Sequence, residues 1–258
     1  MKLRIRADLV YRFGGRNDAI FKILAAQGGG QTVIEERLEV SGGVRLREDL
    51  EPDTGARLLR GRLAGETAVA YQALVDNGAP SGLPAFAPPT DWSDLPADVL
   101  IHLLPSRYCP SDRFLRFVAR AFAGTSGAER VRAILDWIAV NIDYQPGVSD
   151  VETTAARTFT DRAGVCRDFT HLAVSFCRAS GLPARAVAAY AHDMALPDFH
   201  AVAEVWLDGG WRLIDPTGLA PIEGLARICA GRDAADIAFL TTTLNCELVR
   251  QSIAVEAV

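Results

Sequence analysis

Cys166 lies near the start of the segment GVCRDFTHLAVSFCRASGLPAR, which covers residues 164–185. Apolar residues recur in this segment at helical spacing, and Gly181 and Pro183 are typical of a helix end. We therefore expect a helix from Cys166 to about Ser180, with the cysteine in its first turn. Unpaired N–H groups and the helix dipole favour an anion at this end, so the position favours a thiolate nucleophile. The same N–H groups stabilise the oxyanion that forms when a thiolate attacks a carbonyl carbon.

The other cysteines are weaker candidates for a nucleophile than Cys166. The chain holds five in all, namely Cys109, Cys166, Cys177, Cys229 and Cys246. This odd number lacks the spacing of a disulfide framework, so we expect free thiols. Cys177 lies deep within the predicted helix and is best interpreted as a packing residue. Cys166 is therefore the candidate for chemistry.

A thiol nucleophile needs a base, and the chain has four histidines: His102, His171, His192 and His200. His171 lies on the same predicted helix as Cys166, at a spacing that does not make the two side chains face each other. His192 belongs to a polar loop, and His102 to a proline-rich stretch. His200 opens a strand-like run of mostly apolar residues, which makes it the best-placed candidate.

A carboxylate partner for His200 follows from the hairpin that the next residues predict. Asp208-Gly209 is a strong signal for a two-residue turn, which places Leu207 opposite Gly210. In this register His200 and Asp215 are diagonal neighbours on one face, with Cβ atoms about 7 Å apart or less. A three-residue loop without a bulge would move the carboxylate to the opposite face, so the prediction depends on the turn.

Together these residues predict a catalytic triad. Cys166 supplies the thiolate, His200 takes and returns the proton, and Asp215 orients the imidazole. Taken alone, His200 is most simply interpreted as a packed histidine in a strand, and Asp215 as an aspartate that forms a turn. The occurrence of all three residues together favours a catalytic role.

The elements that would position the triad fall into two halves. Residues 1–80 predict many short strands separated by glycine-rich or turn-forming breaks such as Gly14-Gly15, and hence a β-rich, sandwich-like accessory domain. In the first strand, alternate residues from Leu3 to Tyr11 are apolar. Prolines and glycines then mark a connection over residues 81–105. Residues 106–258 are expected to form the catalytic domain.

The order of elements in the second half is helices followed by strands, which is typical of an α+β fold. DRFLRFVARAFAG and GAERVRAILDWIAVNIDY predict two helices before the one that carries Cys166. Strand-like runs follow at residues 185–191, 200–207 and 211–215.

Composition narrows the functional classes. The chain has 258 residues with a net charge of −5 at pH 7, which argues against electrostatic binding to nucleic acid or to an anionic membrane. The first residues alternate charged and apolar types instead of forming the apolar core of a secretory signal, and no apolar stretch reaches the length of a membrane span. We therefore expect a cytoplasmic protein; its oligomeric state is left open.

Three motifs resemble those of the transglutaminase-like superfamily. GVCRDFTHL contains Cys166, HAVAEVW begins with His200, and DPT begins with Asp215. The order of the motifs is specific, and the chain looks like the bacterial transglutaminase-like proteins provisionally described as cysteine proteases. The resemblance covers about residues 100–240, where LLPSRYCPSD and GRDAAD flank the core.

This resemblance implies a papain-like core, in which a helix carrying the cysteine packs on an antiparallel sheet carrying the histidine and the aspartate. It also implies that Cys166, His200 and Asp215 are the catalytic residues. In animal transglutaminases a tryptophan upstream of the cysteine helps to hold the oxyanion. Trp92 and Trp137 are not in a recognisable position for that role, so the second oxyanion donor is unassigned. No acidic calcium loop is evident, and no cofactor or metal is expected.

The predicted chemistry is acyl transfer through a thioester, with a peptide or protein amide as substrate. If water accepts the acyl group, the protein is a cysteine protease or amidase, which we favour; if an amine accepts it, the protein is a protein-glutamine transglutaminase. A non-catalytic binding protein on the same fold is a further alternative, which the intact triad argues against. A zinc site from Cys166, His171 and His200 is disfavoured by the helical spacing of the first two.

Several neighbours of the predicted triad have two interpretations. Asp168 is best explained by the helix dipole, and Trp206 and Trp211 either wall the site or stabilise the hairpin as a cross-strand pair. Tyr144 and Tyr190 are candidate substrate contacts, for which core packing is the favoured explanation.

Overall fold

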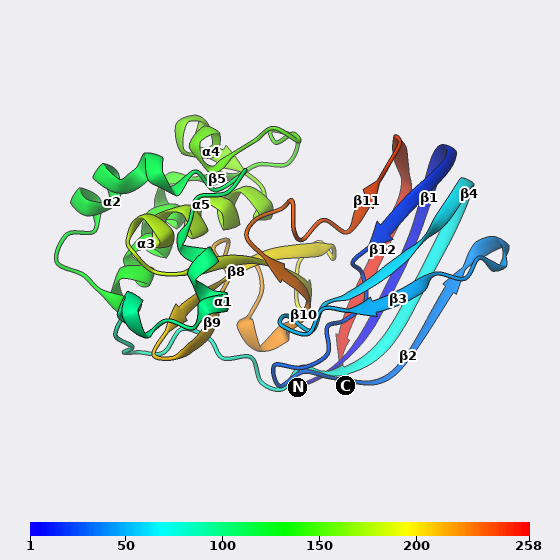
Figure 1. The fold of residues 1–258 in the computed structure, drawn as a ribbon, viewed down its shortest axis with the longest axis horizontal. Coiled ribbons are helices and arrows are strands. Elements are labelled where there is room, and N and C mark those ends of the chain that lie inside the picture. The colour runs from blue at the N-terminus through cyan, green and yellow to red at the C-terminus, as the bar shows by residue number, and fades with distance from the viewer.

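Two antiparallel sheets organise the fold, a long one built by both ends of the chain and a shorter one covered by helices (Figure 1). The computed structural model describes residues 1–258. The helices are α1 (Ala97–Leu100), α2 (Leu115–Ala121), α3 (Gly127–Asn141), α4 (Ala155–Asp161) and α5 (Cys166–Ala179). The strands are β1 (Lys2–Phe21), β2 (Thr32–Val40), β3 (Arg47–Leu50), β4 (Arg57–Asp76), β5 (Asp143–Tyr144), β6 (Ala163–Gly164), β7 (Ala184–Ala191), β8 (Phe199–Leu207), β9 (Gly210–Ile214), β10 (Leu225–Gly231), β11 (Leu240–Thr242) and β12 (Cys246–Ala257).

The first sheet has the order β11-β1-β4-β2, with β12 also paired to β1 and β3 to β4. The predicted alternation in β1 is confirmed, because Leu3, Ile5 and the following odd-numbered positions are buried. The expectation of many short strands was wrong, since β1 and β4 each run for 20 residues. Gly14-Gly15 lies inside β1, where the register with β4 shifts between Phe13 and Asn17. A bulge absorbs the glycines that the sequence indicated as a break.

The end of the chain returns to this first sheet. β12 pairs antiparallel with β1 from Leu3 opposite Ala257 to Phe13 opposite Cys246, and β11 pairs with the far end of β1. The structure therefore differs from the prediction that residues 106–258 form one domain. The last strands of that range, β11 and β12, belong to the sheet that residues 1–80 form. The physical reason is that β1 has a row of backbone N–H and C=O groups along its outer side, which β11 and β12 satisfy.

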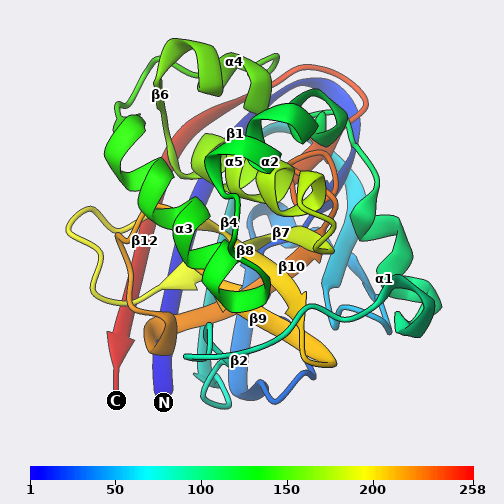
Figure 2. The same ribbon diagram turned by 90° about the vertical axis from the view of Figure 1, so that its left-hand side faces the viewer.

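The second sheet has the order β10-β7-β8-β9 and carries the α+β core. Figure 2 shows α5 crossing in front of β7 and β8, with the first sheet behind them. The apolar face of α5 packs with Ala203, Val205 and Leu207 of β8, and α3 and α4 pack against α5 from the other side. The expected mixed fold, with the cysteine helix on an antiparallel sheet, is thereby confirmed; β10 was not predicted.

The two sheets also pack against each other. Tyr71 of β4 stacks on Tyr190 of β7 with ring centroids 6.4 Å apart, and the Tyr190 hydroxyl donates to the Ile23 carbonyl at 2.6 Å. One buried cluster contains side chains from both sheets. The β-rich half is thus a single sheet whose sandwich partner is the sheet of the other half. Tyr190, for which we favoured packing over substrate contact, is fully buried in this core.

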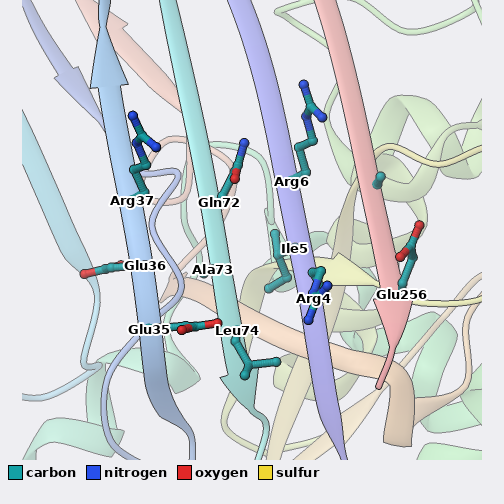
Figure 3. A pocket seen from close by; sticks show the side chains of 11 residues that line it. Arg4, Ile5, Arg6, Glu35, Glu36, Arg37, Gln72, Ala73, Leu74 and Glu256 are labelled. Atoms are coloured by element: carbon teal, nitrogen blue, oxygen red, sulfur yellow. The ribbon is translucent and has the colours of Figure 1, made fainter.

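The outer face of the first sheet is a charged surface. Figure 3 shows Arg6 and Arg37 with Glu35 and Glu256 spread along adjacent strands around a shallow hollow of about 570 Å³. The side chains that line it include no cysteine, histidine or serine, and the face that packs on the second sheet is the opposite one. This hollow therefore lacks the residues for nucleophilic catalysis. None of the helices combines the length and apolar character needed to traverse a bilayer.

Candidate active site

The helix α5 begins at Cys166, as the sequence predicted, and its start is fixed by a buried carboxylate. Asp168 Oδ2 accepts a hydrogen bond of 2.9 Å from the backbone N–H of Val165, and the side chain is fully buried. Gly164 leaves room for this contact, because a Cβ atom at that position would lie 2.7 Å from Cβ of Asp168. Asp168 is thus a helix cap as well as a charge near the helix dipole.

The hairpin that carries the other two residues has the predicted register. Leu207 pairs with Gly210, and Ala203 pairs with Ile214. Asp208 and Gly209 both have positive φ values, 50° and 70°, as a type I′ turn requires. His200 therefore lies near the start of β8 and Asp215 directly follows β9, on the face that the register predicted.

His200 and Asp215 are in direct contact. The Nε2 atom of His200 lies 2.9 Å from Oδ2 of Asp215, and both side chains are almost completely buried. Burial acts to raise the pKa of Asp215, but its hydrogen bonds with His200 and Thr217 lower it below the ordinary value. The carboxylate is therefore held as an anion beside the imidazole.

The Asp215 carboxylate is held by further donors. Oδ1 accepts from the Thr217 backbone N–H at 2.9 Å and from the Thr217 hydroxyl at 2.7 Å. Oδ2 accepts from the Ala220 N–H at 3.0 Å in addition to its contact with His200. The DPT motif thus supplies the carboxylate and two of the donors that fix its orientation.

The other side of the His200 ring faces Cys166. Burial acts to lower the pKa of His200, but the hydrogen bond with Asp215 and the nearness of Asp215 and Cys166 raise it to about 9. Because Nε2 contacts Asp215, the nitrogen left for the thiol is Nδ1, which is buried and has no hydrogen-bond partner. Thr170, one turn after Cys166, donates to the carbonyl of Ala201 at 2.9 Å and so ties the helix to the strand beside His200. Cys166 itself is partly exposed, which lets a substrate reach it.

The remaining histidines lie outside this cluster. His171 is fully buried, stacks on Tyr108 and accepts a hydrogen bond from the Ala234 N–H at 3.1 Å. Burial lowers the pKa of His171 to about 4, so the ring is neutral. His102 packs against Trp211, and His192 contacts the Val255 carbonyl. The zinc alternative is not supported, because His171 is directed to Ala234 and Tyr108.

Trp206 and Trp211 form a cross-strand pair with ring centroids 5.3 Å apart. They lie next to the turn, whereas His200 is six residues back along β8, or about 20 Å at ~3.3 Å per residue. The guanidinium of Arg185 covers the ring of Trp211. The pair therefore stabilises the hairpin and does not wall the site at Cys166.

Comparison with known proteins agrees with this architecture. The model of the transglutaminase-like superfamily matches residues 116–216, which include Cys166, His200 and Asp215. The crystal structure of a protein from Cytophaga hutchinsonii, provisionally described as a cysteine protease, superimposes with a TM-score of 0.92 at 33% sequence identity. The match covers 99% of this chain and 90% of that one. The chain belongs to the transglutaminase-like superfamily.

Another relative of this transglutaminase-like protein is an uncharacterised protein of Mycobacterium leprae, 30% identical over 162 residues. The match covers 57% of this chain and 58% of the mycobacterial protein. The periplasmic domain of TgpA from Pseudomonas aeruginosa is more distant, with 18% identity and a TM-score of 0.45 over 86% of this chain and 92% of that one.

Tyr144 of the transglutaminase-like core is the neighbour whose position the sequence did not settle. Its side chain is 44% exposed, and β5 pairs it with Gly164, two residues before Cys166. Packing, the explanation that we favoured, accounts only for the ring of Tyr144. The centroid of this ring lies 5.8 Å from the centroid of the Phe169 ring. A two-residue strand carries no periodic signal, so its pairing was not predictable from the sequence.

Proposed function

We propose that the protein is a thiol acyl-transfer enzyme with Cys166, His200 and Asp215 as its triad, and that it cleaves an amide or isopeptide bond in a peptide or protein. The observation that carries this proposal is the position of the His200 ring. It is buried, held by Asp215 through Nε2, and near enough to Cys166 for the cysteine to act on the pKa of the imidazole, while its Nδ1 atom is left without a partner.

The chemistry follows from these contacts. The Cys166 sulfur attacks the amide carbonyl carbon, and the pair of electrons of the C=O π bond moves onto oxygen. His200 then gives its proton to the amide nitrogen, the C–N bond breaks, and a thioester remains on Cys166. Water attacks the thioester in a second step, His200 takes its proton, and the carboxylic acid and free thiol are released. The raised pKa of His200, about 9, keeps the ring protonated at neutral pH and therefore able to protonate the leaving amine.

An amine acceptor in place of water would make the protein a protein-glutamine transglutaminase with the same residues. The description of the Cytophaga relative as a cysteine protease favours hydrolysis. The third alternative, a non-catalytic binding protein, is less favoured, because the four hydrogen-bonding contacts of Asp215, one of them with His200, have no evident role in a surface for binding.

Selective alkylation tests the triad. Iodoacetamide modification of each cysteine is followed by peptide mass spectrometry across a pH series, in the wild type and in His200→Ala. Cys166 should react at neutral pH faster than Cys246, which is also partly exposed but has no such surroundings. The advantage should disappear in His200→Ala. Equal rates for Cys166 and Cys246 in the wild type would refute the triad.

A second experiment separates hydrolysis from amine transfer. A glutaminyl peptide is incubated with and without a primary amine, and the masses of the products are measured, with Cys166→Ala as the control. Release of ammonia to give a glutamyl peptide, or cleavage of the chain, supports hydrolysis; incorporation of the amine supports transfer. Absence of any product from a panel of peptides, together with unreactive Cys166, would favour the binding protein.

The cytoplasmic location expected in the sequence analysis remains a prediction. Its test is fractionation of the native host with detection of the chain in each compartment.

A further inference from the structure

A second oxyanion donor is the part of the site that the triad leaves open. The first donor is the backbone N–H of Cys166, at the start of α5. Neither upstream tryptophan reaches the site. The indole N–H of Trp92 donates to the Gly181 carbonyl at 2.9 Å, and Trp137 stacks on Phe159 in an aromatic cluster.

Tyr144 is placed beside the start of α5 by backbone contacts. β5 and β6 pair in parallel, with Tyr144 opposite Gly164, and the Gln145 N–H donates to the Gly164 carbonyl at 2.9 Å. The ring also lies against Phe169 in the first turn of the helix. Three contacts therefore hold the tyrosine at the cysteine, on an element that does not belong to the sheet of His200.

The side chain of Tyr144 lies beside the first turn of α5, because its backbone pairs with Gly164 and its ring lies against Phe169. The pKa of Tyr144 responds to Cys166, in keeping with this position. Burial and the nearby Cys166 thiol raise the pKa of Tyr144 above its ordinary value, so the phenol keeps its proton and remains a donor. Tyr144 is 44% exposed, so a substrate bound at Cys166 can reach it.

We propose that the Tyr144 hydroxyl is the second donor of the oxyanion hole and acts together with the Cys166 N–H. When the sulfur bonds to the carbonyl carbon, the π pair moves to oxygen, and the two donors stabilise that charge. When the pair returns, the bond to the leaving group breaks. Tyr144 is then a catalytic residue, and this inference rests on the proposed acyl-transfer function.

Two reagents that attack the same sulfur by different routes test the proposal. p-Nitrophenyl acetate acylates Cys166 through an oxyanion and releases p-nitrophenolate, whereas iodoacetamide alkylates it at a saturated carbon without one. Tyr144→Phe should lower the acylation rate by about 10²-fold while alkylation stays within about threefold of the wild type. Tyr108→Phe is the matched control, because it also removes a tyrosine hydroxyl, but one that donates to the Val151 carbonyl at 2.8 Å.

Each outcome has one meaning. A loss of acylation of about tenfold or more, with alkylation preserved, supports Tyr144 as the donor. A smaller loss, an equal loss of both reactions, or the same loss in Tyr108→Phe overturns it. Protection of the buried Cys109, Cys177 and Cys229 from iodoacetamide shows that the variant is folded. If the wild type is not acylated at Cys166, which mass spectrometry of the thioester detects, the proposed function itself fails and the inference with it.

Discussion

His200 and Asp215 contact each other across a hairpin whose register is set by two residues at its turn. The ring nitrogen Nε2 and the carboxylate Oδ2 are 2.9 Å apart, although the two residues lie on different strand ends. The turn at Asp208 and Gly209 determines which face Asp215 occupies, because strand side chains alternate between faces. The geometry of the candidate site thus depends on a turn that touches none of the reacting atoms.

Replacement of Gly209 should test this turn. Gly209 has a φ of 70°, and nothing lies within 4 Å of an added Cβ, so Gly209→Ala costs only backbone strain, about 1–2 kcal/mol. Gly210→Ala is the matched control, since Gly210 does not have positive φ and its Cβ would make ordinary contact with Arg212. Urea unfolding measures both free energies. Equal values for the two variants would contradict the role of the left-handed conformation.

The hydroxyl of Thr217 should matter for the orientation of Asp215. Thr217→Val removes a hydrogen bond of 2.7 Å to Oδ1 but leaves the backbone N–H contact, so we expect a loss of about 1 kcal/mol in unfolding free energy. We also expect slower alkylation of Cys166 at neutral pH, because a less firmly held Asp215 supports His200 less well. Thr217→Ser keeps the hydroxyl and should restore both properties. A Ser variant that behaves like the Val variant would show that the methyl group, rather than the hydrogen bond, is responsible.

The raised pKa of His200 predicts a pH dependence of stability. A group whose pKa is higher in the folded state binds its proton more tightly there, so its contribution is complete below about pH 6.5, the unfolded value. That contribution should be lost as the pH rises through about 9, the folded value. For a shift of this size it is on the order of 3 kcal/mol.

The measurement is the urea unfolding free energy at pH 6 and above the pKa of about 9, in the wild type and in His200→Gln. The wild type should lose stability between the two conditions relative to the variant, in which the imidazole is absent. The acyl-transfer rate should fall over the same range, since a neutral His200 has no proton for the leaving group. A parallel decline in wild type and variant would assign the pH dependence to other groups.

Local patterns predicted the parts of the site that depend on local structure. The helix from Cys166 and the register of the hairpin each follow from a few adjacent residues, and the structure has both. The partner of β12 was not predictable in this way, because nothing in its own residues specifies which distant strand it pairs with. Gly14-Gly15 was wrongly interpreted as a break between strands for a related reason, because glycines are compatible both with a turn and with a bulge inside a strand.

The tyrosine beside Cys166 shows the same limit at the site itself. Tyr144 is placed beside the start of α5 by a parallel pair of two residues on each strand, and such short strands give no periodic signal. The sequence therefore indicated Cys166, His200 and Asp215, whose neighbours carry strong helix and turn signals. It gave Tyr144 only as a candidate substrate contact with packing as the favoured explanation, because tertiary contacts alone place this residue.

Removal of the carboxylate of Asp168 should destabilise the start of α5. In Asp168→Ala the N–H of Val165 loses its acceptor, and the Arg167 guanidinium loses its neighbouring charge, so we expect a loss of about 1–3 kcal/mol in unfolding free energy. Cys166 should also be alkylated less selectively, because its helix turn is less well defined. Asp168→Asn retains an oxygen that can accept from Val165 and should recover most of the stability. Hydrogen exchange of the Val165 amide, measured in both variants, separates the lost cap from a general loosening, which would accelerate exchange throughout α5 equally.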